Sequence, residues 1–143
     1  MAIYADNKTL LLSDTATNDS DKTFTVPAGD RYRVLSGNIN LITTATVGNR
    51  QLDVQFRDDA NVVLFTIRAG AVQAASVTRD YKIIPGAPRE SAFVAAEIVL
   101  DNMPLDMILD SGYDIRVFDS AAVDAAADDM VVHIVVQDIN HRM

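Results

Sequence analysis

Strict alternation of apolar and polar side chains over residues 50–57 limits the fold of this chain more than any other feature of its sequence. Every second residue of RQLDVQFR is apolar, namely Leu52, Val54 and Phe56. A period of two places these side chains on one face of a β-strand and the polar ones on the other. The polar residues 58–61 and the apolar run 62–67 follow, so we predict a β-hairpin over residues 50–67.

Strand-length segments separated by turn residues recur along the rest of the chain. The turns are marked by Pro27-Ala28-Gly29-Asp30, Gly48-Asn49, Pro85-Gly86-Ala87-Pro88, Asp101-Asn102 and Ser111-Gly112. The segments between them cover residues 22–26, 31–46, 74–84, 91–100, 113–118 and 130–137. About eight strands at this spacing, with few stretches long enough for a helix, predict an all-β domain. We expect an antiparallel, jelly-roll-like sandwich.

Two segments leave alternatives open within this arrangement. The alanine-rich residues 120–129 are compatible with a short helical turn capped by Ser120, or with a loop of small residues. Residues 1–21 form either an N-terminal arm, or a first strand over residues 9–13 followed by a polar loop. We assign residues 22–143 to a single β-sandwich domain.

Length and composition fit one globular domain. The chain has 143 residues, of which 49% are hydrophobic and 22% charged, a balance typical of a folded protein. It contains no cysteine, which excludes disulfides, thiolate metal sites and cysteine nucleophiles. No apolar run is long enough to span a membrane, and residues 1–10 lack the pattern of a signal peptide. We therefore expect synthesis in the cytoplasm and no membrane partner.

The net charge of −8 argues against nucleic acid as a partner. An acidic surface repels the phosphate backbone. Glu90 and Glu97 are the only glutamates among twenty acidic residues. Because aspartate favours turns and glutamate favours helices, this bias also supports a β fold.

The chain lacks the residue patterns of the common catalytic sites. It has two histidines, His133 within an apolar segment and the nearly terminal His141, and they do not stand at metal-ligand spacing. No serine lies in a nucleophile-elbow pattern, and the absence of tryptophan disfavours a glycosidase. We expect no catalytic residues, no metal and no cofactor, and therefore a protein that binds or assembles.

Two acidic clusters are candidates for calcium ligands, because carboxylates suit this ion. The clusters are Asp58-Asp59 and the group Asp124, Asp128 and Asp129. Neither matches the spaced loop of a dedicated calcium site. We interpret them as solvated turn residues.

Two predicted strands are apolar on both faces, namely residues 62–67 and, apart from His133, residues 130–136. One face of a sandwich strand meets the core and the other normally meets water, so such strands need a second cover. That cover is either another subunit, or loops and the N-terminal segment of the same chain.

Three stretches resemble small virion proteins of tailed bacteriophages: TFTVPAGDRYRVLSGNINLITTATVGNRQLDVQFRD, IIPGAPRESAF and LDSGYDIRVFDSAAVDAAADDMVVHIVV. The resemblance spans residues 23–136. Its most distinctive elements are Val26-Pro27-Ala28-Gly29, Gly48-Asn49-Arg50, and Asp119-Ser120 before Asp128-Asp129. Tyr32 stands where many similar proteins carry tryptophan, and residues 1–22 fall outside the resemblance.

The resemblance implies a jelly-roll capsid cement or decoration protein on the outside of a virion, made in the host cytoplasm. The implied partners are the major capsid protein and further copies of the chain, as a dimer or trimer. Candidate interface residues are Leu10, Leu11, Leu12, Arg31, Arg33, Val63, Phe65, Val131, His133 and Val135. An alternative function is a tail or head-fibre module that recognises a host glycan or protein.

Arginines on the predicted strands are candidates for ion pairs with capsid carboxylates, or are solvated strand residues. They are Arg31, Arg33, Arg50, Arg57, Arg68, Arg79 and Arg89.

Overall fold

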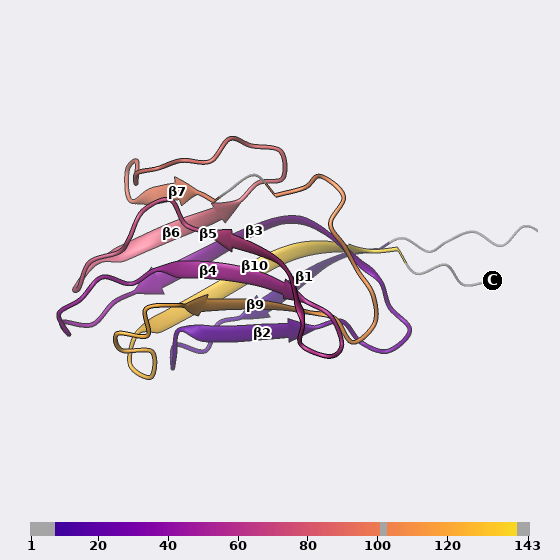
Figure 1. Cartoon of the computed structure of the whole chain (residues 1–143), viewed down its shortest axis with the longest axis horizontal. Coiled ribbons are helices and arrows are strands. Elements are labelled where there is room, and N and C mark those ends of the chain that lie inside the picture. Colours follow the sequence, from indigo (N-terminus) through magenta and orange to yellow (C-terminus); the bar gives the residue numbers. More distant parts are fainter. Residues whose placement is uncertain (1–7, 101–102, 140–143) are drawn as a thin grey trace, which may run out of the picture.

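The computed structural model describes residues 8–100 and 103–139 of the chain. Ten strands make up its regular structure (Figure 1). They are β1 (Lys8–Asp14), β2 (Asp21–Thr25), β3 (Tyr32–Ile42), β4 (Leu52–Arg57), β5 (Val63–Arg68), β6 (Thr78–Ile83), β7 (Glu97–Val99), β8 (Ile108–Leu109), β9 (Asp114–Asp119) and β10 (Asp129–Asp138). Within the described ranges, nothing helical has the length and apolar character to cross a membrane.

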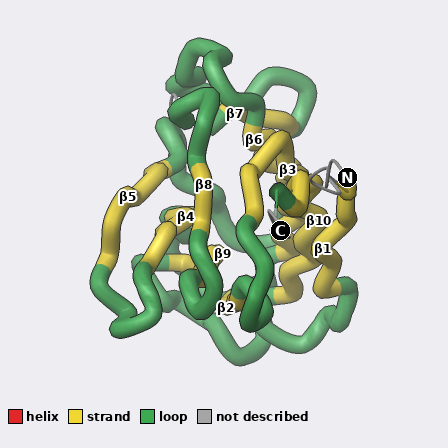
Figure 2. The backbone as a smooth tube through the Cα atoms, turned by 90° about the vertical axis from the view of Figure 1, so that its right-hand side faces the viewer, coloured by secondary structure: helices red, strands yellow, loops and turns green. Residues whose placement is uncertain are grey.

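The strands form two sheets whose order is that of a jelly roll. One sheet has the order β1-β10-β3-β6-β7, with β8 also paired to β3, and the other has the order β2-β9-β4-β5. Without the short β7 and β8, eight strands remain in two sheets of four. Apart from the β4–β5 hairpin, successive strands cross between the two sheets, as in a double Greek key. Figure 2 shows the two layers, with β5, β4 and β9 on one side and β6, β3, β10 and β1 on the other. The predicted all-β jelly-roll sandwich is therefore confirmed.

The alternating residues of β4 supply the core, as predicted. Leu52, Val54 and Phe56 are completely buried, and β4 pairs with β5 as an antiparallel hairpin. In β10 the buried positions also alternate, and they are Met130, Val132, Ile134 and Val136. Burying such side chains contributes roughly 1.5–3 kcal/mol each, so the contact between the two sheets dominates the stability of the fold.

Three predicted strands are shorter in the structure than in the sequence-based expectation. The segment 31–46 ends as a strand at Ile42, the segment 74–84 forms a strand only from Thr78, and the segment 91–100 only over Glu97–Val99. A tight turn explains the last of these differences, because Val94 and Glu97 exchange backbone hydrogen bonds in both directions. This leaves only the residues after the turn in an extended conformation that reaches β6.

Residues 120–128, before β10 begins, form a loop, which was one of the two alternatives for this segment. The carboxylate of Asp119 accepts hydrogen bonds from the backbone N–H groups of Ala121 and Val123. This local capture of N–H groups competes with helix formation. Ala122 between them has a φ of 51°, outside the right-handed helical region.

At the N-terminal end of the described chain, Lys8–Asp14 form the edge strand β1. It pairs antiparallel with β10 over its whole length, from Lys8 opposite Asp138 to Asp14 opposite Val132. The polar residues 15–20 connect it to β2 in the other sheet.

Candidate assembly surface

The outer face of the four-stranded sheet carries a ladder of paired charges. Each of three arginines contacts one aspartate through both Nε and Nη2, and the pairs are Arg57–Asp114, Arg68–Asp53 and Arg116–Asp21, with N–O distances between 2.8 and 3.3 Å. The hydrogen-bonded carboxylates raise the pKa of Arg57 and Arg68. Bidentate pairs of this kind satisfy both partners, so this face presents matched charges.

The outer face of the six-stranded sheet differs, because its centre is uncharged. We call this surface the uncharged face and define it by Leu11 and Ser13 of β1, Val131, His133 and Val135 of β10, and Ser36, Asn38 and Asn40 of β3. The sheet register places Leu11 opposite Val135 and Ser13 opposite His133. Leu11 is 60% exposed. An exposed leucine beside half-buried valines, without charge, is the composition of a contact surface.

His133 is tied to β1 across the sheet. Its Nδ1 lies 2.8 Å from the hydroxyl of Ser13, and Asn38 lies opposite it on β3. Within the part of the chain that the structure describes, the ring has no hydrogen bond to a carboxylate. Asn38 Oδ1 is buried and has no hydrogen-bond partner in this part of the chain. A buried acceptor without a hydrogen bond costs free energy.

The structure brings four of the ten candidate interface residues together, namely Leu11, Val131, His133 and Val135. The other six lie elsewhere. Leu10, Leu12 and Phe65 pack against the core, so these three contribute to folding within the chain. Val63 is 44% exposed on edge strand β5.

Two of the candidate arginines lie at one end of the six-stranded sheet. Arg31 Nε contacts Asp110 at 2.8 Å. Arg33 Nε lies 3.6 Å from Asp106, and its Nη1 donates to Gln137. Both guanidinium groups therefore have an acidic neighbour within the chain, but the buried Nε of Arg33 has no hydrogen-bond partner among the described residues.

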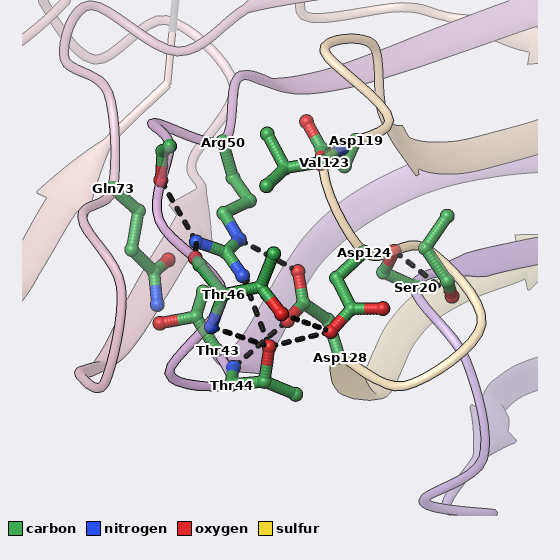
Figure 3. A network of polar contacts seen from close by, with 12 residues as sticks. Ser20, Thr43, Thr44, Thr46, Arg50, Gln73, Asp119, Val123, Asp124 and Asp128 are labelled. Carbon is green, nitrogen blue, oxygen red and sulfur yellow. Dashed lines mark hydrogen bonds and ion pairs between the residues drawn. The ribbon is translucent and has the colours of Figure 1, made fainter.

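Arg50 is buried, which corrects its interpretation as a strand arginine available for an interface. Arg50 and Asp128 both have completely buried side chains and form a bidentate pair, with Nε–Oδ2 at 2.8 Å and Nη2–Oδ1 at 3.1 Å. Figure 3 shows the guanidinium enclosed between Asp128 and the loop after β3. Nη1 donates to the carbonyls of Thr46 and Gly48, and Nη2 also donates to the hydroxyl of Thr44. All five N–H groups of the guanidinium are thus used.

The same network corrects the interpretation of Asp128 as a solvated turn residue. Its carboxylate also accepts the backbone N–H of Thr44 at 2.8 Å. Asp124 accepts hydrogen bonds from the hydroxyls of Thr44 and Thr46, at 2.6 and 3.0 Å. Protein donors therefore occupy both carboxylate oxygens of Asp128 and the Oδ2 of Asp124. Among residues 8–100 and 103–139, no group of three or more histidine or acidic side chains is arranged to hold a metal ion.

Replacing Asp124 by asparagine is expected to weaken the loss of stability at acidic pH. The hydroxyls of Thr44 and Thr46 lower the pKa of Asp124. A folded-state pKa below the unfolded value, about 3.9 for aspartate, gives stability that is present above that pH and lost as the pH falls through the folded value. Urea midpoints between pH 5 and pH 2 should therefore fall less steeply in Asp124→Asn. Thr46→Val, which removes one donor, should lie in between, and identical slopes would contradict this assignment.

A shallow cavity of about 250 Å³ lies beside β7, which is below the roughly 300–1,000 Å³ of typical ligand sites. Its charged lining residues are Lys82, Glu90 and Glu97. Lys82 Nζ lies 3.8 Å from Glu97 Oε1, and Glu90 accepts the backbone N–H of Val99. Each of these charged groups therefore has a partner within the protein, so the cavity is not a strong candidate site.

Comparisons with known proteins give only distant likenesses. No family model and no curated protein matches the chain. A chain from the structure of infectious bursal disease virus Gx strain has 10% identity and a TM-score of 0.43 over 97% of this chain and 34% of its own length. A chain from the structure of PfGH50B has 8% identity and a TM-score of 0.41, over 98% of this chain and 23% of its own length. A chain of turnip yellow mosaic virus has 6% identity and a TM-score of 0.35, over 100% of this chain and 85% of its own length.

The present chain thus spans about a third and a quarter of the length of the first two matched chains. With TM-scores below 0.5, these likenesses carry no argument about function. The assignment of the fold rests on the strand order of the chain itself.

Proposed function

We propose that this chain is a virion structural protein of a tailed bacteriophage, and that it binds the outside of the capsid and bridges neighbouring major capsid subunits. In this role it acts by binding and not by catalysis. The observation that carries the proposal is the contrast between the two outer faces. The four-stranded sheet pairs the charges on its outer face and exposes Val63 and Leu64 at its edge strand β5, whereas the six-stranded sheet offers an uncharged surface that includes the exposed Leu11. The resemblance of residues 23–136 to small phage virion proteins supplies the class of partner.

The uncharged face suits a partner that is repeated on a lattice. Apolar area removed from water contributes about 25 cal/mol per Å², so a modest patch gives modest affinity at a single site. On a capsid the same contact is repeated many times, and a protein that touches two subunits gains from effective concentration. The net charge of −8 keeps the free protein soluble without opposing contact through this face.

The test is binding of the purified protein to expanded capsids assembled without it. Val135→Glu places a negative charge on the uncharged face, and Gln55→Glu places the same charge on the outer face of the four-stranded sheet. We expect Val135→Glu to weaken co-sedimentation with capsids by at least about tenfold, since a buried unpaired charge is costly. Gln55→Glu should bind as the unmodified protein does. Urea unfolding of both variants checks that the fold is retained.

Capsids with bound protein should also withstand a higher temperature than capsids without it. If the unmodified protein neither bound such capsids nor raised their thermal stability, the proposed function would be wrong. Binding to a glycan array without capsid binding would favour the alternative, a host-recognition module.

A further inference from the structure

The outer edge of β1 is a long, regular strand edge. Over the described residues, β1 pairs on one side with β10 and ends the order of its sheet. The register between β1 and β10 is continuous for seven residues. The edge strand β5, in contrast, has an irregular register at Phe56/Arg57, and β7 has only three residues. Bulges and short length are common ways to prevent strand edges from pairing, and β1 uses neither.

The sequence of β1 is complementary to itself when it is reversed. It reads KTLLLSD from Lys8 to Asp14. In an antiparallel pair centred on Leu11, Lys8 of one copy lies opposite Asp14 of the other, and Thr9 lies opposite Ser13. Leu10 lies opposite Leu12, and Leu11 lies opposite its own copy. Opposite charges, hydroxyl pairs and apolar pairs are the combinations that stabilise directly opposed positions.

We propose that β1 pairs with β1 of a second copy of this chain, antiparallel and centred on Leu11, to give a two-fold symmetric dimer. This contact is isologous, because the same strand serves both copies. The two six-stranded sheets then continue into one another, and the edge of each is covered.

Backbone geometry permits this register. In an antiparallel pair, hydrogen-bonded and non-hydrogen-bonded residue pairs alternate along the strands. A pair centred on residue 11 joins odd positions to odd positions and even positions to even positions. The backbone N–H and C=O groups that point away from β10 belong either to the odd or to the even positions of β1. In both cases they face the outward-pointing N–H and C=O groups of the other copy.

Neighbouring registers are worse. A slip by one residue joins side chains on opposite faces of the sheet. A slip by two residues places Lys8 opposite Leu12 in one direction, and Asp14 opposite Leu10 in the other. Only the register centred on Leu11 matches both charges along the full strand.

Asp14 is held in place at the end of β1. Its Oδ1 accepts from the backbone N–H of Ala16 at 3.2 Å and from the buried ammonium of Lys22 at 3.3 Å. Its side chain is still 40% exposed. The charge that Lys8 of the second copy would meet is therefore already fixed before the two copies associate.

The dimer also enlarges the uncharged face. A two-fold axis perpendicular to the sheet keeps outer faces on the same side, so Leu11 of each copy lies beside the other and next to Val135 of its own chain. Leu10 and Leu12 pair on the core side. The two uncharged faces thus form one surface across both copies. The proposal does not depend on the capsid, since it is tested with the purified protein alone.

Cross-linking through single cysteines tests the register, because the chain has no cysteine of its own. In Leu11→Cys the two introduced residues are directly opposite, with Cα atoms about 4.5–5.5 Å apart. In Thr9→Cys they are four positions apart, about 13 Å along the strand, beyond the roughly 7 Å limit for a disulfide. We expect rapid disulfide formation for Leu11→Cys, slow formation for Thr9→Cys, and rapid formation when Thr9→Cys is mixed with Ser13→Cys. Equal rates for Leu11→Cys and Thr9→Cys would overturn the register.

Charge variants at Leu11 test the dimer itself. Leu11→Lys and Leu11→Glu each place two like charges together at the axis, so each variant alone should be monomeric in sedimentation. An equimolar mixture should form a heterodimer. Because Leu11 is exposed, the urea midpoints should stay close to that of the unmodified protein. A monomer for the unmodified protein at all concentrations, or dimers that persist in Leu11→Lys alone, would refute the proposed dimer. Either result would leave the capsid-binding test unaffected.

Discussion

Replacing Arg50 by methionine is expected to lower the free energy of unfolding by about 3–5 kcal/mol, the range found when one partner of a buried ion pair is removed. The substitution leaves the completely buried carboxylate of Asp128 without its cation. It also leaves the carbonyls of Thr46 and Gly48 without the donors that Nη1 supplies. A loss of this size is a large part of the stability of an ordinary domain.

Urea unfolding of a set of variants separates the charge effect from the loss of packing. Asp128→Leu alone should be about as destabilising as Arg50→Met, because it leaves the buried guanidinium of Arg50 without its carboxylate partner. The double variant removes both charges, so its loss should be clearly smaller than the sum of the two single losses. Arg31→Met is the matched control, since it breaks an ion pair with exposed partners, for which about 0–1 kcal/mol is expected. Additive losses, or an Arg50→Met effect no larger than the control, would contradict this account.

The sequence predicts the architecture well because the alternation of residues is local. The spacing of Leu52, Val54 and Phe56 predicts a half-buried strand within eight residues, and the polar turn after them predicts a second strand paired with it. The strand order confirms the jelly roll. Boundaries are less predictable where side chains capture the backbone, as Asp119 does in the loop before β10.

The sequence does not predict which polar residues are buried, because their partners are distant in the chain. Arg50 and Asp128 are 78 positions apart, and each looks like a surface residue in its own segment. The distinctive pieces Gly48-Asn49-Arg50 and Asp128-Asp129 prove to be joined in one network. The spacing of charged residues alone contains no signal for this.

The candidate surface was predictable only in part for the same reason. An apolar segment at residues 130–136 with a central histidine indicated that β10 needs a cover on both faces. The hydrogen bond between His133 and Ser13 joins residues 120 positions apart and depends on the register of β1 against β10. Leu10, Leu11 and Leu12 look equivalent in the sequence, and the pleat of the strand sends only Leu11 outward.

Gly70→Ala is expected to lower the free energy of unfolding, although it adds only a single methyl group. Gly70 follows β5, and a Cβ atom there would collide with the backbone carbonyl of Glu90 and lie 3.0 Å from the Cα of Ser91. The segment around Glu90 cannot move away freely from Gly70. The backbone N–H of Glu90 donates to the carbonyl of Val99, and its carboxylate accepts the N–H of Val99 at 2.9 Å.

The structure therefore has two responses to Gly70→Ala, and both are costly. Either the backbone at Gly70 shifts to make room for the added methyl group, or the segment around Glu90 detaches from β7. We expect the free energy of unfolding to fall by about 1–3 kcal/mol, the usual range for overpacking. Gly29→Ala is the control for backbone strain, because Gly29 has a φ of +84° and no atom within 4 Å of the added Cβ. Its expected loss is about 1 kcal/mol, the cost of a left-handed non-glycine residue. Hydrogen exchange at the amide of Val99 should accelerate in Gly70→Ala and stay unchanged in Gly29→Ala. Unchanged exchange at Val99 together with equal losses in both variants would show that the close approach to Glu90 does not hold β7 in place.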